Sequence, residues 1–404
     1  MIRVVLPGGA RLAACWLLVL AALAPATARA ATPTWLVGTA EGATAAGSVP
    51  GARIAPGIRL VHGASARRLR RLPGVRWVER NRRFRPSSLT APTDPLFGRQ
   101  WALRSARVRG AWQSTVGGEV PVAMLDSGID FSNPDLAPNL WTNRAELPGN
   151  GVDDDANGFI DDVHGADTVG WDGDPADGLG HGTAVASLIG ARGDNGFGIS
   201  GVAWSVRLMP VKVVHDQGWA TTATMVAGLR YALSNGARIV NISLNGPDSS
   251  QALDEAIRQA EQQGALVIAS AGNDAANRDR VPSYPASVRS RAVITVASAT
   301  RAGALAPSSA YGRGSVDIAA PGENVLTGEL GGRCATRSGT SFAAAYVTGA
   351  AALLAAARPG ASGSRLRAAL LGSSRRGRGT GRAIAGGRLD VTAALRRLGR
   401  LRSP

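Results

Sequence analysis

The 404-residue sequence predicts an α/β fold: a doubly wound, mostly parallel sheet with helices on both faces, preceded by a small separate segment. From about residue 90 onward, apolar runs rich in Val, Ile, Leu and Ala alternate with helical stretches. Continuous apolar runs of this kind are typical of strands buried on both faces, as in a parallel sheet. Binding sites in such sheets lie at the carboxyl ends of the strands, so polar residues at those ends are the first candidates for function.

The predicted elements follow in alternation along the chain. Strands are expected at 120–125, 206–214, 237–244, 265–270, 292–297 and 316–319. Helices are expected at 182–190, 221–234, 249–263 and 343–357, with shorter ones at 364–371 and 389–398. The helix at 343–357 is a run of small residues that ends before Pro359, because proline cannot continue a helix.

Residues 1–30 are typical of a secretory signal peptide. Basic residues precede an apolar run at 13–25, and Ala28-Arg29-Ala30 matches a cleavage pattern. The run is too short to span a bilayer. Leu12-Ala13-Ala14-Cys15 is similar to a lipid-attachment box, but the apolar core follows Cys15 instead of ending at it. We therefore expect cleavage after Ala30, secretion without a stable membrane anchor, and Cys334 as the only cysteine of the mature chain.

Residues 31–90 form a predicted pro-segment whose charge is opposite to that of the body. Residues 31–85 carry 11 Arg and 2 Glu, whereas residues 86–357 have a net charge of −7. Sixty residues rarely build a strong core alone. One interpretation is a solvated basic linker. The other is an intramolecular inhibitor and folding assistant that depends on the acidic body for its own folding. The opposite charges favour this second interpretation.

The catalytic domain is expected at 91–398, with a tail at 399–404. The basic ends of the chain flank an acidic middle, and no stripe of basic and aromatic residues appears. This distribution argues against a nucleic-acid partner despite the net charge of +16. We expect a monomer.

Three residues suited to nucleophilic catalysis stand at predicted strand or helix ends. Asp126 closes the first core strand, His181 opens a helix between two glycines, and Ser341 begins the small-residue helix. Taken singly, a serine there is commonly a helix cap and such an aspartate a turn former. Taken together, they supply a hydroxyl nucleophile, a base and the carboxylate that orients the base. The free N–H groups of the helix start would also favour an oxyanion.

The chain resembles the subtilisin family of serine endopeptidases. Its motifs Asp126-Ser127-Gly128, His181-Gly182-Thr183 and Gly339-Thr340-Ser341-Phe342-Ala343 stand in the family's order, within residues 92–398. The α/β-hydrolases differ, because their serine comes first and lies in G-x-S-x-G. The resemblance implies a secreted endopeptidase that acts on proteins and peptides through an acyl-enzyme. The alternatives are a catalytically inactive binding or scaffold protein on the same fold, and an esterase.

Two further stretches resemble binding elements of the family. Ser270-Ala271-Gly272-Asn273 matches the oxyanion-hole motif, which implies that the Asn273 amide and the Ser341 N–H stabilise the tetrahedral intermediate. The substrate strand, usually Ser-Leu-Gly, reads Ser243-Leu244-Asn245 here. An extended substrate is expected to pair with this strand edge. Asn245 places a side chain on the cleft wall where the family generally has none, and it would either narrow the cleft or shift the substrate preference.

The acidic loop at 153–162 matches the start of a calcium loop, D-x-[DN]-x-[DN]-G. Oxygens at alternate positions suit a hard cation with six to eight ligands. The predicted ligands are Asp153, Asp155, Asn157 and Asp161. His164 stands where an EF-hand has its closing Glu, so this is not an EF-hand, and a solvated acidic turn is the alternative. The resemblance implies a second structural calcium, with Asp135 and Asn195 among its ligands.

Overall fold

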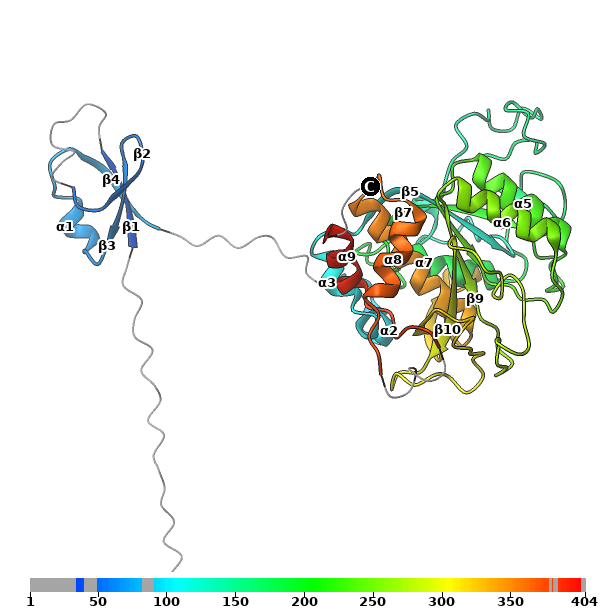
Figure 1. The fold of residues 1–404 in the computed structure, drawn as a ribbon. Coiled ribbons are helices and arrows are strands. Elements are labelled where there is room, and N and C mark those ends of the chain that lie inside the picture. Colours follow the sequence, from blue (N-terminus) through cyan, green and yellow to red (C-terminus); the bar gives the residue numbers. More distant parts are fainter. Residues whose placement is uncertain (1–33, 40–48, 82–90, 378–379, 381–383, 401–404) are drawn as a thin grey trace, which may run out of the picture. The chain divides into compact units, whose positions relative to one another are not determined.

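The computed structural model describes residues 34–39, 49–81, 91–377, 380 and 384–400 (Figure 1). Contacts divide the chain into two compact units, one ending at Ser87 and the other beginning at Ser88. The predicted signal peptide at 1–30 and residues 401–404 of the predicted tail lie outside the described residues.

The first unit is a four-stranded antiparallel sheet in the order β2-β3-β1-β4, with one short helix. Its elements are β1 (Thr34–Thr39), β2 (Ala52–Ala55), β3 (Ile58–His62), α1 (Ala66–Leu69) and β4 (Val75–Arg80). Its small apolar core consists of Val37, Val49, Val61, Leu69 and Val78. The interpretation of this segment as a solvated linker is therefore wrong for the described residues, which fold around a core of their own.

The second unit is built on a seven-stranded sheet in the order β11-β10-β9-β8-β5-β7-β6, and each neighbouring pair of strands is parallel. The strands are β5 (Gly117–Asp126), β6 (Ala166–Asp167), β7 (Ser205–Lys212), β8 (Ile239–Ile242), β9 (Leu266–Ser270), β10 (Val293–Ala299) and β11 (Ile318–Pro321). The predicted parallel α/β fold is confirmed. β8 is shorter than predicted, because the chain after Ser243 leaves the sheet and pairs Gly246 with Tyr284.

Helices cover both faces of this sheet (Figure 1). Along β5, Val122 and Met124 pack into one core cluster, while Ala123 and Leu125 pack into the other, as the twofold alternation of a strand requires. The helices α5 (Thr222–Ser234) and α6 (Gln251–Gln262) cover one face. The other face carries α2 (Trp101–Ser105), α3 (Val108–Trp112), α4 (His181–Gly190), α7 (Thr340–Ala357), α8 (Gly363–Gly372) and α9 (Val391–Arg400).

Shorter elements complete the unit. Three are 3₁₀ turns: η2 (Phe97–Arg99), η3 (Ala137–Asn139) and η4 (Leu330–Gly332). A separate antiparallel hairpin is formed by β12 (Val325–Gly328) and β13 (Cys334–Arg337), and it leads directly into α7.

Helix α7 runs through the core of the second unit. Every residue from Thr340 to Ala355 is buried. Within the described part of the chain, α7 is long and apolar enough to cross a bilayer, but 89% of it is buried inside the unit, so it is a core helix. Close packing needs its small residues: a Cβ on Gly349 would lie 2.9 Å from the Ile189 carbonyl oxygen. Thr348 Oγ1 also donates a hydrogen bond of 2.9 Å to Asn241 Oδ1, which fixes α7 against β8.

Candidate active site

Asp126 and His181 form a pair at the carboxyl end of β5, in which the carboxylate is buried and the imidazole is half-buried. His181 Nδ1 lies 2.7 Å from Asp126 Oδ1 and donates its proton to that carboxylate. Asp126 is completely buried, and its Oδ1 also accepts the backbone N–H of Ser127 at 2.8 Å. Because Nδ1 carries the donated proton, Nε2 is the acceptor of the neutral ring. The contact therefore holds the imidazole in the tautomer that a general base needs.

Asp177 positions the helix that carries His181, a role that the motifs did not reveal. Its Oδ2 accepts the backbone N–H of Thr183 at 2.8 Å and the Thr183 hydroxyl at 2.7 Å. Its Oδ1 accepts the N–H of Gly180 at 2.7 Å and the hydroxyl of Ser127 at 2.8 Å. One carboxylate thus satisfies free donors at the start of α4 and ties that helix to the chain just after Asp126.

The glycines of the two motifs allow the Asp126 and His181 segments to approach each other. A Cβ on Gly182 would lie 2.1 Å from the carbonyl oxygen of Gly128. Gly128 itself has φ +107°. A side chain at Gly182 would push α4 away from the end of β5, and one at Gly128 would meet the carbonyl of Pro175, so these glycines support the short contact between Asp126 and His181.

Charges around the imidazole set its basicity. Burial lowers the pKa of His181, but the charge of Asp126 and the hydrogen bond to it outweigh burial and hold the pKa above its ordinary value of 6.5. The positive charge of Arg337 acts in the opposite direction. Arg337 ends β13 and forms an ion pair with Glu329, donating from Nε to Glu329 Oε1 at 2.7 Å.

Ser341 lies in the first turn of α7, with its side chain directed toward the end of β8. Its Oγ donates a hydrogen bond of 3.3 Å to the carbonyl of Ser243. The ring of Phe342, the next residue, lies 5.8 Å from the His181 ring, centroid to centroid. Among the described hydrogen bonds there is none between Ser341 Oγ and His181, and such bonds commonly tighten only when substrate is bound.

Asn273 is fixed beside Ser341 by Thr340. The backbone N–H of Thr340 donates to Asn273 Oδ1 at 2.8 Å, and the Thr340 hydroxyl donates to the same oxygen at 3.0 Å. Thr340 Oγ1 in turn accepts the N–H of Gly272 at 3.1 Å. Because Oδ1 accepts both donors, the exposed side chain of Asn273 has its Nδ2 free to donate. The arrangement offers one side-chain donor next to the N–H groups at the start of α7.

A buried arginine stabilises the loop that contains Asn273. Arg278 is 5% exposed and donates from Nε to the carbonyl of Ala271 at 2.7 Å. Its Nη2 donates to Asp274 Oδ1 at 2.6 Å. Ala271 and Asp274, on either side of Asn273, are therefore bound to the same guanidinium group.

The segment that follows β8 forms one wall of the cleft. Leu244 and Asn245 take part in a pocket of about 440 Å³, whose apolar lining includes Trp219, Met225 and Tyr284. An apolar side chain of an extended peptide fits such a surface. Ser243 presents its carbonyl to Ser341 Oγ.

The acidic loop brings together a different set of carboxylates from the predicted one. Glu146, Asp155 and Asp162 have ligand oxygens within 4.8 Å of one another. Asn157 donates from Nδ2 to Asp162 Oδ2 at 3.0 Å, so it borders the cluster. Glu146 Oε2 is buried and has no hydrogen-bond partner, which fits a site for a hard cation.

The other two predicted ligands of that loop are turned to the backbone. Asp153 accepts the N–H groups of Asn157 and Gly158 at 3.0 and 2.8 Å. Asp161 accepts three N–H groups of the turn at 149–151, at 2.8 to 3.1 Å. In the structure Asp153 and Asp161 serve as acceptors for turn N–H groups, because tight turns leave N–H groups that need acceptors, and their role as ligands stays a prediction.

A second acidic group surrounds Asp135. Asn195 donates from Nδ2 to Asp135 Oδ1 at 2.9 Å, so the structure brings these two predicted ligands together. Asp94, which the sequence reasoning missed, accepts the N–H groups of Asp194 and Asn195 at 3.0 Å each. Burial raises the pKa of Asp135 to about 6, and the nearby charge of Asp94 adds to that rise. Asp94 and Asp135 are both buried, and a cation bound here would offset their negative charges.

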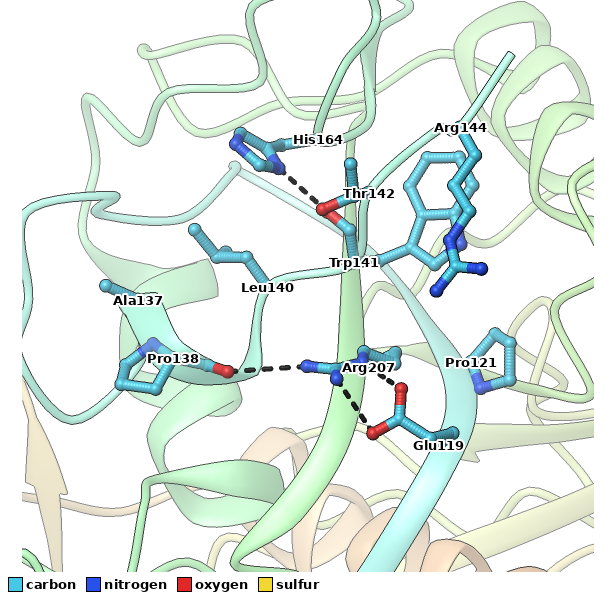
Figure 2. Close-up of a pocket in the computed structure, with 10 residues that line it drawn as sticks. All are labelled: Glu119, Pro121, Ala137, Pro138, Leu140, Trp141, Thr142, Arg144, His164 and Arg207. Atoms are coloured by element: carbon cyan, nitrogen blue, oxygen red, sulfur yellow. Dashed lines mark hydrogen bonds and ion pairs between the residues drawn. The ribbon is translucent and has the colours of Figure 1, made fainter. Parts of the chain in front are cut away.

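A separate hollow of about 720 Å³ lies beside β5 and β7, lined by Trp141, Arg144, His164 and Arg207 among others (Figure 2). Some of its polar groups are paired with each other: Arg207 forms two hydrogen bonds to Glu119, of 2.6 and 2.7 Å, and His164 Nδ1 donates to the Trp141 carbonyl at 2.8 Å. Its histidine is bonded to a backbone carbonyl, whereas His181 is bonded to a buried carboxylate.

A parallel α/β sheet with a carboxylate, an imidazole and a helix-start serine at its carboxyl edge defines a serine hydrolase. Residues 117–391 match the model of the subtilase family. The chain is 32% identical to thermitase of Thermoactinomyces vulgaris over 305 residues, which is 75% of this chain and 99% of that protein. It is 34% identical to subtilisin Savinase of Lederbergia lenta over 268 residues, 66% of this chain and 88% of that protein.

Among solved structures, a protease of Pseudoalteromonas arctica matches with a TM-score of 0.64 and 27% identity, covering 76% of this chain and all of that one. The chain belongs to the subtilase family and is a subtilisin-like serine endopeptidase. The family resemblance seen in the sequence motifs is confirmed.

Proposed function

We propose that the protein is a secreted endopeptidase that cleaves peptide bonds through an acyl-enzyme, with Ser341 as nucleophile, His181 as general base and acid, and Asp126 as its orienting carboxylate. The observation that carries this proposal is the 2.7 Å contact between buried Asp126 and His181 Nδ1. This contact leaves His181 Nε2 as the proton acceptor, the atom that must take the proton from the nucleophile.

The steps follow from these atoms. Ser341 Oγ attacks the scissile carbonyl carbon as its proton passes to His181 Nε2, and Asp126 stabilises the imidazolium. The negative charge that forms on the carbonyl oxygen is stabilised by Asn273 Nδ2 and the N–H of Ser341. His181 then gives its proton to the leaving amine, and an ester to Ser341 remains. Water, deprotonated by His181, hydrolyses this ester and restores the serine.

The test is labelling by a serine-directed fluorophosphonate, with Ser341→Ala as control. Labelling of the wild type and not of the variant is expected. Equal labelling of the two would sink the assignment of Ser341. Clearing of casein, compared with hydrolysis of short esters, separates the endopeptidase from the esterase alternative, and no reaction with either favours the inactive scaffold.

The first unit serves in this proposal as a pro-segment that assists folding, inhibits the cleft and is cut near residues 85–92. Its support is a separately folded antiparallel sheet in a stretch whose positive charge is opposite to that of the body. The signal-like sequence at 1–30 supports export. Mass spectrometry of active secreted material checks both points, and an intact 31–404 chain in that material would count against processing.

Calcium is proposed as a structural ion at two places. Glu146, Asp155 and Asp162, with Asn157 beside them, would hold one ion, and Asp94, Asp135 and Asn195 would hold the other. The bound ion would neutralise buried carboxylates and join segments that are distant in the sequence. Chelator should therefore lower the melting temperature, and an unchanged melting curve after complete calcium removal would contradict both sites.

A further inference from the structure

Three chain segments surround the space beside Ser341 in which the acyl part of a substrate would lie. Residues 243–246 follow β8 and residues 270–273 end β9, and these strands are neighbours, with Ile242 opposite Ala269. The third segment is Ser283-Tyr284. It pairs with Gly246 through two backbone hydrogen bonds: Gly246 N–H to the Tyr284 carbonyl at 2.9 Å, and the reverse at 2.7 Å.

A substrate side chain must enter this space. In the proposed mechanism, the attacked carbonyl carbon binds Ser341 Oγ and its oxygen accepts a hydrogen bond from Asn273 Nδ2. Ser243 contacts Ser341 through its carbonyl, and Asn273 is bound to the neighbouring Thr340. The side chain of the residue that carries the carbonyl therefore falls between residues 243–246 and residues 270–273. The size of that gap decides which residue the enzyme accepts there.

The side chain of Asn245 spans the gap and contacts both other segments. Its Nδ2 donates to Ser270 Oγ at 2.7 Å, and its Oδ1 lies 3.5 Å from Ser283 Oγ, whose hydroxyl also lies 3.2 Å from the Gly246 carbonyl. Ser270 is completely buried and Ser283 is 7% exposed, whereas Asn245 is exposed. The surface that a substrate meets is therefore the amide of Asn245, with the two serines covered beneath it.

A large substrate side chain would have to displace this amide. Displacement breaks the 2.7 Å bond and leaves the buried Ser270 hydroxyl without that partner. A loss of this kind corresponds to about 10- to 100-fold in kcat/KM. Glycine, alanine or serine need no such rearrangement, because their side chains extend little or not at all beyond Cβ.

We propose that Asn245 closes the pocket for the residue whose carbonyl is attacked, so that the enzyme cleaves after small side chains and rejects aromatic and long aliphatic ones. The proposal rests on the endopeptidase function proposed above and names its substrate class. The sequence left open whether Asn245 narrows the cleft or shifts the substrate preference. Here Asn245 narrows the cleft, and the substrate preference shifts as a result.

The test uses three internally quenched peptides that differ only in the residue before the scissile bond: Ala, Leu or Phe. Wild type is compared with Asn245→Gly and Asn245→Ala, after active-site titration of each. The control is Asn235→Gly, the same chemical change at the C-terminal end of α5, toward the amino end of the sheet. The readout is the ratio of kcat/KM for the Phe peptide to that for the Ala peptide, which cancels differences in the fraction of folded enzyme.

The expected ratio is low in wild type, about 100-fold higher in Asn245→Gly, and between the two in Asn245→Ala. Asn235→Gly should keep the wild-type ratio. Efficient cleavage after Phe by wild type, or a ratio unchanged in both Asn245 variants, would overturn the proposal. Failure of wild type to cut any of the peptides or casein is a different result, because it overturns the endopeptidase function itself.

Discussion

Thr340 offers a sharp test of how Asn273, the proposed oxyanion donor, is held. Its hydroxyl donates to Asn273 Oδ1 at 3.0 Å and accepts the Gly272 N–H at 3.1 Å. Replacing Thr340 with Val keeps the shape of the side chain and removes both bonds. The Thr340 backbone N–H still donates to Asn273 Oδ1 at 2.8 Å, so the amide keeps one of its two anchors.

The magnitudes follow from these contacts. Losing the partly buried bond to Asn273 costs about 1 kcal/mol, and leaving the buried N–H of Gly272 unsatisfied costs about 1–3 kcal/mol. We therefore expect Thr340→Val to lower the free energy of unfolding by about 3 kcal/mol. Complete loss of the equivalent asparagine in the related subtilisin costs about 10²–10³ in turnover, a magnitude that belongs to that enzyme. Because one anchor remains, we expect a smaller loss in kcat, about tenfold.

The assay measures kcat and KM on a peptide, after active-site titration, together with thermal unfolding. Thr340→Ser is the matched control, because it retains the hydroxyl and should approach wild type in both measurements. A Thr340→Val enzyme with wild-type kcat would refute the idea that the hydroxyl positions Asn273. Thr340→Val keeps the methyl group and Thr340→Ser keeps the hydroxyl, so equal losses in the two variants would show that packing of the side chain matters as much as its hydrogen bonds.

Three further changes test other parts of the site. Arg337→Gln removes a positive charge near His181, so the pKa of His181 should rise further. The acid limb of kcat/KM should then move to higher pH, because the imidazole acts as a base only when it is neutral. Arg333→Gln in the same hairpin is the control, and a move of the acid limb to lower pH contradicts the reasoning. Asp177→Asn should lower the melting temperature and kcat together, with a stability loss of about 1–3 kcal/mol in denaturant titrations, since it weakens several charge-assisted bonds. Glu146→Gln should reduce the rise in melting temperature that added Ca²⁺ produces, and an undiminished rise excludes Glu146 as a ligand.

The sequence predicted the sheet well, because its strands are buried on both faces and stand out as apolar runs. Asp126, His181 and Ser341 were visible for a related reason: each is a reactive residue at the end of such a run or at the start of a helix. Thr340 lies inside a recognised motif, yet its bonds to Asn273 depend on a loop 67 residues earlier in the chain. Spacing along the sequence does not indicate such a contact.

The acidic loop shows where pattern reasoning stops. Alternating carboxylates predicted a cation site, but the pattern does not say which side chains turn inward. Asp161 satisfies the N–H groups of a turn, while its neighbour Asp162 is completely buried beside the Tyr231 hydroxyl. Glu146 enters the cluster from outside the predicted motif. The choice between backbone and cation depends on the three-dimensional course of the loop.

Because α7 lies inside the core, the position of Ser341 depends on the packing of the whole second unit. A surface helix has a polar outer face in contact with water, whereas this helix is enclosed from Thr340 to Ala355. Small adjustments of the nucleophile along the helix axis would require the surrounding strands and α4 to move as well. Heat should therefore not produce a folded but inactive enzyme by loosening this helix. Loss of fluorophosphonate reactivity and loss of ellipticity should instead follow a single time course.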